Sequence, residues 1–239
     1  MMDSDVTADF AALAPWVFRF RIGDADYGGK VSAIDDSRIK HFFRFAPEAH
    51  TILELGSLEG AHVFELARHP HVTRVLGIEG RAANLRKAQL VQKLLRAKNT
   101  EFVEANLEEC DLTPFGKFDA VFCSGLLYHL PEPWKLIARL PAVAPKLFLW
   151  THYAAEAEAE PMGDNLRGKI QGEGGADEPL SGLSSISRWL TLGSLINVLT
   201  IHGYESIHII EHDLKNGNGP AVTLSAAQSP DVAGKVVEF

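Results

Sequence analysis

The stretch Thr51-Ile52-Leu53-Glu54-Leu55-Gly56-Ser57-Leu58-Glu59-Gly60 decides the fold of this chain. It begins with a short apolar run that predicts a strand, and Gly56 ends that run sharply. Helix-forming residues follow over 61–69. Where a strand passes through a glycine turn into a helix, free backbone N–H groups can approach a ligand closely. The stretch therefore predicts a strand–turn–helix unit with a ligand site at its turn.

Outward from this stretch, apolar runs alternate with helix-length segments, which is typical of βαβ units around a parallel sheet. We expect further strands at 72–78, 100–104, 119–124, 146–151, 205–212 and 221–226, and further helices at 82–98, 133–140 and 187–202. The turn signal at 216–219, Asn-Gly-Asn-Gly, predicts that the last two strands form an antiparallel hairpin. The sequence thus predicts an α/β protein with a Rossmann-like, seven-stranded, mostly parallel sheet, helices on both faces and a C-terminal antiparallel β-hairpin.

Two segments stand apart from this alternation. Residues 1–50 are expected to form an N-terminal cap on the substrate side, while residues 51–239 form what is effectively one domain. Within that domain, residues 154–187 are rich in glycine and glutamate and poor in large apolar side chains. Such a stretch cannot close a core of its own, so it predicts a long insertion after the fifth strand, either a mobile lid or a partly disordered loop.

Composition limits the partners and the compartment. A net charge of −8 disfavours binding to nucleic acid, because phosphate backbones require a concentrated basic surface, and a small-molecule substrate is expected instead. No apolar run approaches the roughly 18 residues of a membrane span, and the start of the chain lacks the basic region of a signal peptide. The two cysteines, Cys110 and Cys123, cannot build a disulfide framework, so we expect a cytoplasmic location. The sequence leaves the oligomeric state open.

The identity of the cofactor follows from charge. Glu79 ends the second predicted strand, about 23 residues beyond Gly56, where a carboxylate can accept both ribose hydroxyls of an adenosine-containing ligand. Leu58 occupies the place of the second glycine of the dinucleotide fingerprint, and Glu54 would add negative charge beside a pyrophosphate. Glu54 would instead suit the ammonium of a methionine moiety, directly or through a water. These charges favour S-adenosylmethionine over a nicotinamide dinucleotide.

Four segments resemble, in order, the motifs of class I S-adenosylmethionine-dependent methyltransferases. They are Glu54–Gly60 for motif I, Gly77-Ile78-Glu79-Gly80 for acidic motif II, Glu104-Ala105-Asn106-Leu107 for adenine-contacting motif III, and Phe118–Leu130 for motif IV with its loop. The resemblance covers about residues 50–150, and the hairpin end of the fold matches to about residue 226. Leu58 in place of the usual middle glycine and Asn106 in place of the commoner aspartate depart from the family pattern.

The resemblance and the charge argument together predict the cofactor site. Its residues are Glu54, Gly56, Ser57, Gly60, Glu79, Asn106, Leu107, Ser124 and Gly125. The resemblance implies that Glu79 holds the ribose hydroxyls and that Asn106 and Leu107 hold the adenine, Asn106 through its side-chain oxygen. No metal is expected.

The acceptor side of the site is predicted from the residues at and after the ends of the fourth and fifth strands. His129 is the candidate general base, and the alternative is a structural histidine that shapes the cofactor pocket. The residues expected to line the acceptor pocket are Tyr27, Tyr128, Trp150, His152 and Tyr153. The leading hypothesis is methyl transfer to an oxygen or nitrogen of a small molecule. The alternatives are a tRNA-nucleoside-modifying methyltransferase, a non-catalytic module that binds S-adenosylmethionine, and a nicotinamide oxidoreductase.

One motif is set aside. His208-Ile209-Ile210-Glu211-His212 matches the H-x-x-E-H pattern of a group of zinc proteases. That chemistry requires a helix, which would bring both histidines to one face. The isoleucines and the turn after them predict a strand here, so this segment is not expected to bind zinc.

Overall fold

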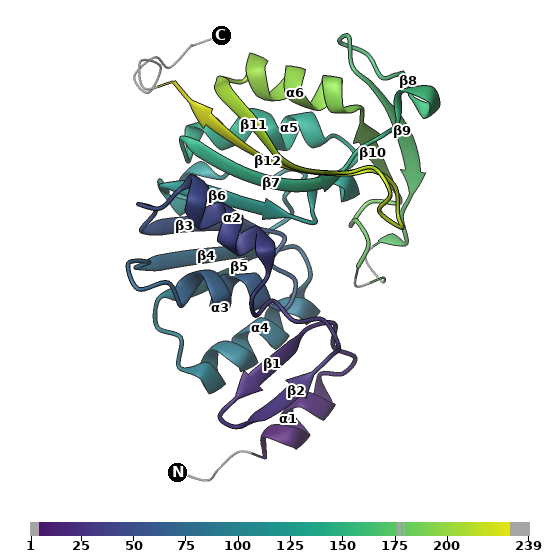
Figure 1. The fold of residues 1–239 in the computed structure, drawn as a ribbon. Coiled ribbons are helices and arrows are strands. Elements are labelled where there is room, and N and C mark those ends of the chain that lie inside the picture. The colour runs from purple at the N-terminus through teal and green to yellow at the C-terminus, as the bar shows by residue number, and fades with distance from the viewer. Residues whose placement is uncertain (1–4, 176–177, 179, 230–239) are drawn as a thin grey trace.

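The centre of the computed structural model is a seven-stranded sheet (Figure 1). Its strands are β3 (Thr51–Leu55), β4 (Arg74–Glu79), β5 (Thr100–Glu104), β6 (Ala120–Ser124), β7 (Lys146–His152), β11 (Tyr204–Asp213) and β12 (Ala221–Gln228). They follow the spatial order β11-β12-β7-β6-β3-β4-β5. The pairs from β7 to β5 are parallel, whereas β12 is antiparallel to both β7 and β11. The predicted Rossmann-like sheet with its terminal hairpin is confirmed.

The structure describes residues 5–175, 178 and 180–229. The predicted N-terminal cap, the insertion and the C-terminal end therefore include positions outside the described residues, namely 1–4, 176, 177, 179 and 230–239. Within the described part, none of the helices is both long enough and apolar enough to cross a membrane.

Helices cover both faces of the sheet. They are α2 (Ser37–Phe45), α3 (Ala61–Ala67), α4 (Ala82–Leu95), α5 (Pro133–Arg139) and α6 (Leu192–Ile201), with single 3₁₀ turns η1 (Thr113–Phe115), η2 (Leu127–His129) and η3 (Leu140–Ala142). On β3, Ile52 packs in a cluster with Phe42 of α2, while Leu53 packs in another with Ile137 of α5. Because both faces of the strand are buried, its sequence is apolar almost throughout rather than alternating.

The N-terminal segment is a small structure of its own beside α4 (Figure 1). It consists of α1 (Val6–Ala12) and the antiparallel hairpin of β1 (Arg19–Ile22) and β2 (Ala25–Gly28). Phe10 and Phe20 pack in one cluster with Phe64 of α3 and Val91 of α4. The hairpin is therefore held against the same helices that follow β3 and β4.

The segment after β7 differs from the predicted loop. After the 3₁₀ turn η4 (Glu156–Glu158) it forms a second sheet, with the order β10-β9-β8, from β8 (Glu160–Pro161), β9 (Arg167–Gly172) and β10 (Ile186–Leu190). The last helix begins at Leu192 and not at the predicted residue 187, because the residues before it pair with β9 as the strand β10. Figure 1 shows this sheet beside the end of the seven-stranded sheet to which β7 and β12 belong.

Candidate functional site

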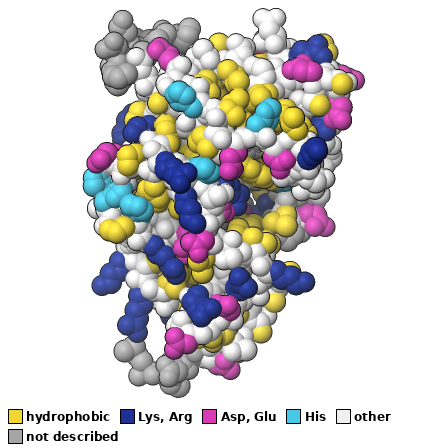
Figure 2. All heavy atoms as spheres, in the orientation of Figure 1, with side chains coloured by type: hydrophobic (Ala, Val, Ile, Leu, Met, Phe, Trp, Pro, Cys, Tyr) yellow, Lys and Arg dark blue, Asp and Glu magenta, His cyan; other side chains and the backbone are white. Residues whose placement is uncertain are grey.

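A cavity of about 690 Å³ lies at the carboxyl ends of the parallel strands. This is the edge at which open α/β sheets bind ligands, and the volume lies within the roughly 300–1,000 Å³ range of ligand pockets. Figure 2 shows a hollow near the middle of the face it draws, with acidic and basic side chains beside it. The predicted site residues that line the cavity are Gly56, Ser57, Glu79, Asn106, Leu107, Ser124, Gly125, Tyr128, His129, Trp150 and His152.

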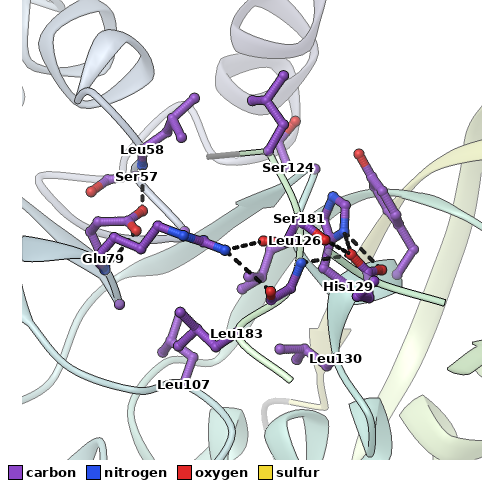
Figure 3. A pocket seen from close by; sticks show the side chains of 18 of the residues that line it. Ser57, Leu58, Glu79, Leu107, Ser124, Leu126, His129, Leu130, Ser181 and Leu183 are labelled. Atoms are coloured by element: carbon purple, nitrogen blue, oxygen red, sulfur yellow. Dashed lines mark hydrogen bonds and ion pairs between the residues drawn. The ribbon is translucent and has the colours of Figure 1, made fainter. Parts of the chain in front are cut away.

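Glu79, at the end of β4, is fixed at one side of the cavity (Figure 3). Its Oε2 accepts a hydrogen bond of 2.8 Å from the backbone N–H of Leu58, and its Oε1 accepts one of 2.9 Å from that of Arg81. Leu58 has a φ of 50°, the left-handed conformation that explains why a glycine is usual at this position. Burial raises the pKa of Glu79 above its ordinary value, although these two backbone donors offset part of the effect. The carboxylate is thus held in place at the edge of the cavity.

A second wall of the cavity comes from the residues after β5. The Asn106 Oδ1 accepts a 3.0 Å hydrogen bond from the backbone N–H of Glu108, and Leu107 is buried beside it. Leu183, from the segment before β10, packs against Gly80 and also lines the cavity. Leu107 and Leu183 therefore give this region an apolar lining next to the Asn106 amide.

Glu54 and Ser57 carry buried polar atoms that lack a protein partner. Glu54 is 1% exposed, and its Oε2 has no hydrogen-bond partner in the described structure. The Ser57 Oγ is likewise buried and without a partner among the described residues. Burial, with the nearby charge of Glu79, raises the pKa of Glu54 well above its ordinary value. Because buried polar groups are normally hydrogen-bonded, two such atoms beside a cavity fit a ligand that supplies a donor.

Arg38, from the first turn of α2, lines the same part of the cavity and was not foreseen from the sequence. Its Nη1 donates a 2.9 Å hydrogen bond to the Ser124 Oγ at the end of β6. Asp36, the N-cap of α2, binds the Arg38 guanidinium at 2.5 Å and the His62 Nε2 at 3.1 Å. Burial would raise the pKa of Asp36, but its bonds to His62 and Arg38 lower it, so the carboxylate remains charged and holds the guanidinium in place.

An aromatic cluster lines the wall that η2, β7 and β10 form. The Tyr128 ring lies 5.9 Å from Trp150, 4.7 Å from His152 and 5.8 Å from Trp189, measured between ring centroids. His152 stacks on Trp189 at 5.0 Å, and its Nδ1 lies 3.0 Å from the backbone oxygen of Gly219. The buried indole N–H of Trp189 has no partner in the described structure.

His129, the last residue of η2, lies on the side of the cavity away from Glu79 (Figure 3). Its Nδ1 is 3.1 Å from both carboxylate oxygens of Glu173, which follows β9. Burial lowers the pKa of His129, and Glu173 counteracts this. The sequence contains no local signal for Glu173, because it lies 44 residues downstream of its partner.

Four of the predicted site residues do not line the cavity. Glu54 is 1% exposed and interacts electrostatically with Glu79 and Arg38, which do line the cavity. Gly60 is the N-cap of α3, where an added Cβ would lie 2.8 Å from Phe102, so the site is one of close packing. Tyr27 stacks on Phe10 at 5.2 Å in the N-terminal cluster, and the Tyr153 hydroxyl lies 2.5 Å from the His212 Nε2. Tyr153 follows His152 on an extended segment, and successive side chains there point to opposite sides.

Known proteins share this architecture. Residues 52–144 match the family model of a methyltransferase domain. The N-terminal domain of EvdMO1, crystallised in the presence of S-adenosylhomocysteine (SAH) and D-fucose, is 33% identical with a TM-score of 0.85, covering 96% of this chain and 98% of that chain. A second structure of that domain, with SAH bound, is 32% identical over the same shares, also with a TM-score of 0.85. Against the longer EvdMO1 structure, which is 30% identical with a TM-score of 0.73, the chain covers 47% of that chain.

A more distant protein shares the fold alone. It is an S-adenosylmethionine-dependent methyltransferase from Mesorhizobium loti, 17% identical with a TM-score of 0.56, covering 80% of this chain and 96% of that chain. No curated protein sequence matches the chain significantly. The cavity at the carboxyl edge of the sheet and the identity to EvdMO1 over almost the whole chain lead to one conclusion. This chain belongs to the class I S-adenosylmethionine-dependent methyltransferases and is an enzyme of that family.

Proposed function

We propose that this methyltransferase transfers the methyl group to a hydroxyl oxygen of a small carbohydrate, with His129 as the general base. The observation that carries the proposal is the position of His129. Its Nδ1 is held by Glu173 at 3.1 Å, and its ring lies 4.2 Å from that of Tyr128, at the edge of the aromatic cluster. A nucleic-acid acceptor is disfavoured by the net charge of −8.

The cofactor would occupy the part of the cavity bounded by β3, β4, β5 and α2. The fixed carboxylate of Glu79 would accept the ribose hydroxyls, and the wall of Asn106 and Leu107 would hold the adenine. The unpartnered Glu54 Oε2, which does not itself line the cavity, would receive the ammonium of the methionine moiety through a water, and Arg38 would bind its carboxylate. S-adenosylmethionine supplies an electrophilic methyl group, so the protein contributes mainly binding, alignment and exclusion of water.

The acceptor would bind against the aromatic cluster. Sugar rings present C–H groups on their faces, which pack on aromatic rings, and hydroxyls at their edges, which need hydrogen-bond partners. The unpartnered Trp189 N–H is such a partner, and Trp189 also lines the cavity. The N-terminal domain of EvdMO1 was crystallised with D-fucose present, which supports a sugar as the acceptor of this chain too.

A sugar hydroxyl is a weak nucleophile and must lose its proton during transfer, which is why a base is required. The His129 Nε2 would take that proton while the hydroxyl oxygen forms the new O–C bond. The electron pair of the broken S–C bond stays on the sulfur, so SAH leaves as a neutral thioether. The imidazolium that results is stabilised by the Glu173 carboxylate and returns its proton to solvent.

The experiment is to incubate the purified protein with S-adenosylmethionine and a panel of hexoses and deoxyhexoses that includes D-fucose, and to measure SAH release and O-methyl product. We expect His129→Ala to lower kcat by about 10²–10⁴-fold with little change in SAH affinity. Trp189→Phe keeps an aromatic ring but loses the N–H, so KM for the sugar should rise, whereas Trp134→Phe on α5, outside the cavity, should not change it. Methylation of amines but of no hydroxyl compound, or an unimpaired His129→Ala, would contradict the proposal.

A further inference from the structure

Glu173, which follows β9, is anchored by hydrogen bonds from Ser181 and Gly182. Its side chain is 7% exposed. Oε2 accepts hydrogen bonds from the Ser181 hydroxyl at 2.5 Å and from the Gly182 backbone N–H at 2.7 Å. Both oxygens also lie 3.1 Å from the His129 Nδ1. The carboxylate therefore joins the segment before β10 to the imidazole.

The donors around Glu173 keep it ionised. Burial would raise its pKa, but the bonds from Ser181 and Gly182, together with the Ser187 hydroxyl and the charge of His129, bring the pKa below its ordinary value. An ionised carboxylate only accepts hydrogen bonds, so the His129 Nδ1 must carry a proton and donate. The lone pair of neutral His129 is then on Nε2, the atom that a base needs.

Other charged and titratable groups face His129. Burial lowers its pKa, and Arg81 and His152 lower it further, whereas Glu173 raises it. The neighbouring Tyr128 has its own pKa raised by burial to about 12, so it remains neutral in the physiological range. Glu173 is thus the group in the described structure that stabilises the protonated form of this imidazole.

The same segment is tied to the proposed ribose site. The Arg81 Nη2 donates to the backbone oxygens of Gly175, Ser181 and Gly182 at 3.0, 2.7 and 3.1 Å, while the Arg81 backbone N–H binds Glu79. Gly182 also packs on the backbone of His129, where an added Cβ would clash with the His129 oxygen. Figure 3 shows Ser181 between Glu79 and His129.

We propose that Glu173 is a positioning residue for methyl transfer, which orients His129 through Nδ1, leaves Nε2 free for the acceptor proton and stabilises the imidazolium that forms. Arg81, Ser181 and Gly182 set the position of Glu173, and through Arg81 they link it to the Glu79 end of the cavity. This inference rests on the proposed role of His129 as the base. It adds that the base is complete only when Ser181 and Gly182 hold the Glu173 carboxylate against the His129 Nδ1.

The test compares Glu173→Gln, Glu173→Asp and the control Glu156→Gln, an exposed residue of η4, in the full chain. The pKa of His129 is measured by NMR titration of the labelled imidazole, whose signal is assigned by its loss in His129→Ala. We expect the pKa of His129 to fall in Glu173→Gln, because a neutral amide no longer stabilises the imidazolium. Glu156→Gln should leave it unchanged, and Glu173→Asp should restore it in part.

Turnover with D-fucose, or with whichever sugar of the panel is methylated, gives the second readout. In Glu173→Gln, kcat should fall about 10–100-fold, the acidic limb of the pH–rate profile should move to lower pH, and SAH affinity should stay the same. A Glu173→Gln protein with wild-type turnover and an unchanged pKa of His129 would overturn the proposal. So would a fall in kcat matched by an equal loss of SAH affinity, since that indicates a merely structural role. If His129→Ala keeps wild-type turnover, the assignment of His129 as the base fails. If His129→Ala is inactive but Glu173→Gln keeps wild-type turnover, the base assignment stands and the positioning role of Glu173 fails.

Discussion

Lys87 of α4 places its Nζ 2.9 Å from the Glu59 Oε1, forming an ion pair in which the Glu59 side chain is fully buried. The other bonds of Glu59 explain why the pair is there. Its carboxylate also accepts the backbone N–H groups of Val17 and Phe18, the residues that precede β1 and line the cavity. A single buried carboxylate in the turn after β3 thus attaches the N-terminal segment to the edge of the cavity.

Breaking this pair should destabilise the fold. Removal of one partner from a buried ion pair typically costs about 3–5 kcal/mol, because the other charge remains buried without compensation. We expect Glu59→Gln to lower the free energy of unfolding by about 3 kcal/mol in urea titrations. Lys87→Met in the Glu59→Gln background should cost much less than it does alone, because the two positions are coupled. Glu132→Gln, in the exposed pair with Lys135, is the control and should cost less than about 1 kcal/mol. Equal losses in the two pairs would contradict the argument.

Glu79 should be required for affinity and not for folding. Replacing it by Ala removes a charged acceptor, which corresponds to about 10–100-fold weaker SAH binding in a calorimetric titration. Glu104 is the matched control, because it is paired with Glu79 in the register of β4 and β5 but is exposed and does not line the cavity. Glu104→Ala is expected to bind SAH normally. Unchanged affinity in Glu79→Ala would remove this residue from the cofactor site.

Arg38 should recognise the amino-acid end of the cofactor, and two ligands can show this. In Arg38→Met, SAH should bind about 10–100-fold more weakly, because a charge-assisted bond is lost, while adenosine, which has no carboxylate, should bind as in the wild type. Arg44→Met, at an exposed position of the same helix, serves as the control. If Arg38→Met weakened SAH and adenosine equally, the guanidinium would be shaping the cavity rather than binding the carboxylate.

We expect Glu54 to contribute to cofactor binding and to lower the free energy of unfolding by an amount that depends on pH. Burial raises its pKa in the folded protein above the ordinary value of 4.5, so the folded state resists ionisation that the unfolded chain accepts. Below pH 4.5 the carboxyl is protonated in both the folded and the unfolded state, so it does not change the free energy of unfolding. As the pH rises above 4.5, the unfolded chain ionises more readily than the folded protein, and the free energy of unfolding falls. Glu54→Gln should therefore be more stable than the wild type by about 1 kcal/mol at pH 8, and this difference should vanish near pH 4.

The measurement for Glu54 is urea unfolding of both proteins across this pH range, with SAH titration at pH 8. The variant should bind SAH more weakly, because the ammonium loses its counter-charge. A Glu54→Gln protein that is less stable than the wild type at pH 8 would show that the carboxylate is compensated within the fold and would contradict the prediction.

Hydrophobic patterns allowed the central sheet to be predicted. The strand expected at 51–55 is β3, the one expected at 100–104 is β5, and the turn at 216–219 joins an antiparallel hairpin. These elements are local, and buried parallel strands carry continuous apolar runs between turn residues. The helix expected from residue 187 was wrong at its start, because residues 187–190 belong to β10, which pairs with β9, a partner that the local sequence does not identify.

The residues of the site also fall into those that local sequence predicts and those that only long-range packing brings together. The sequence by itself determined the residues that end or directly follow β3, β4 and β6, such as Gly56, Glu79 and Ser124, because the ends of adjacent parallel strands must meet at one edge of the sheet. Only the tertiary structure decided that Arg38 and Glu173 join them, and that Tyr27 and Tyr153 lie elsewhere. The physical reason is that side-chain contacts over long sequence separations depend on how whole elements pack, and no local periodicity encodes that packing.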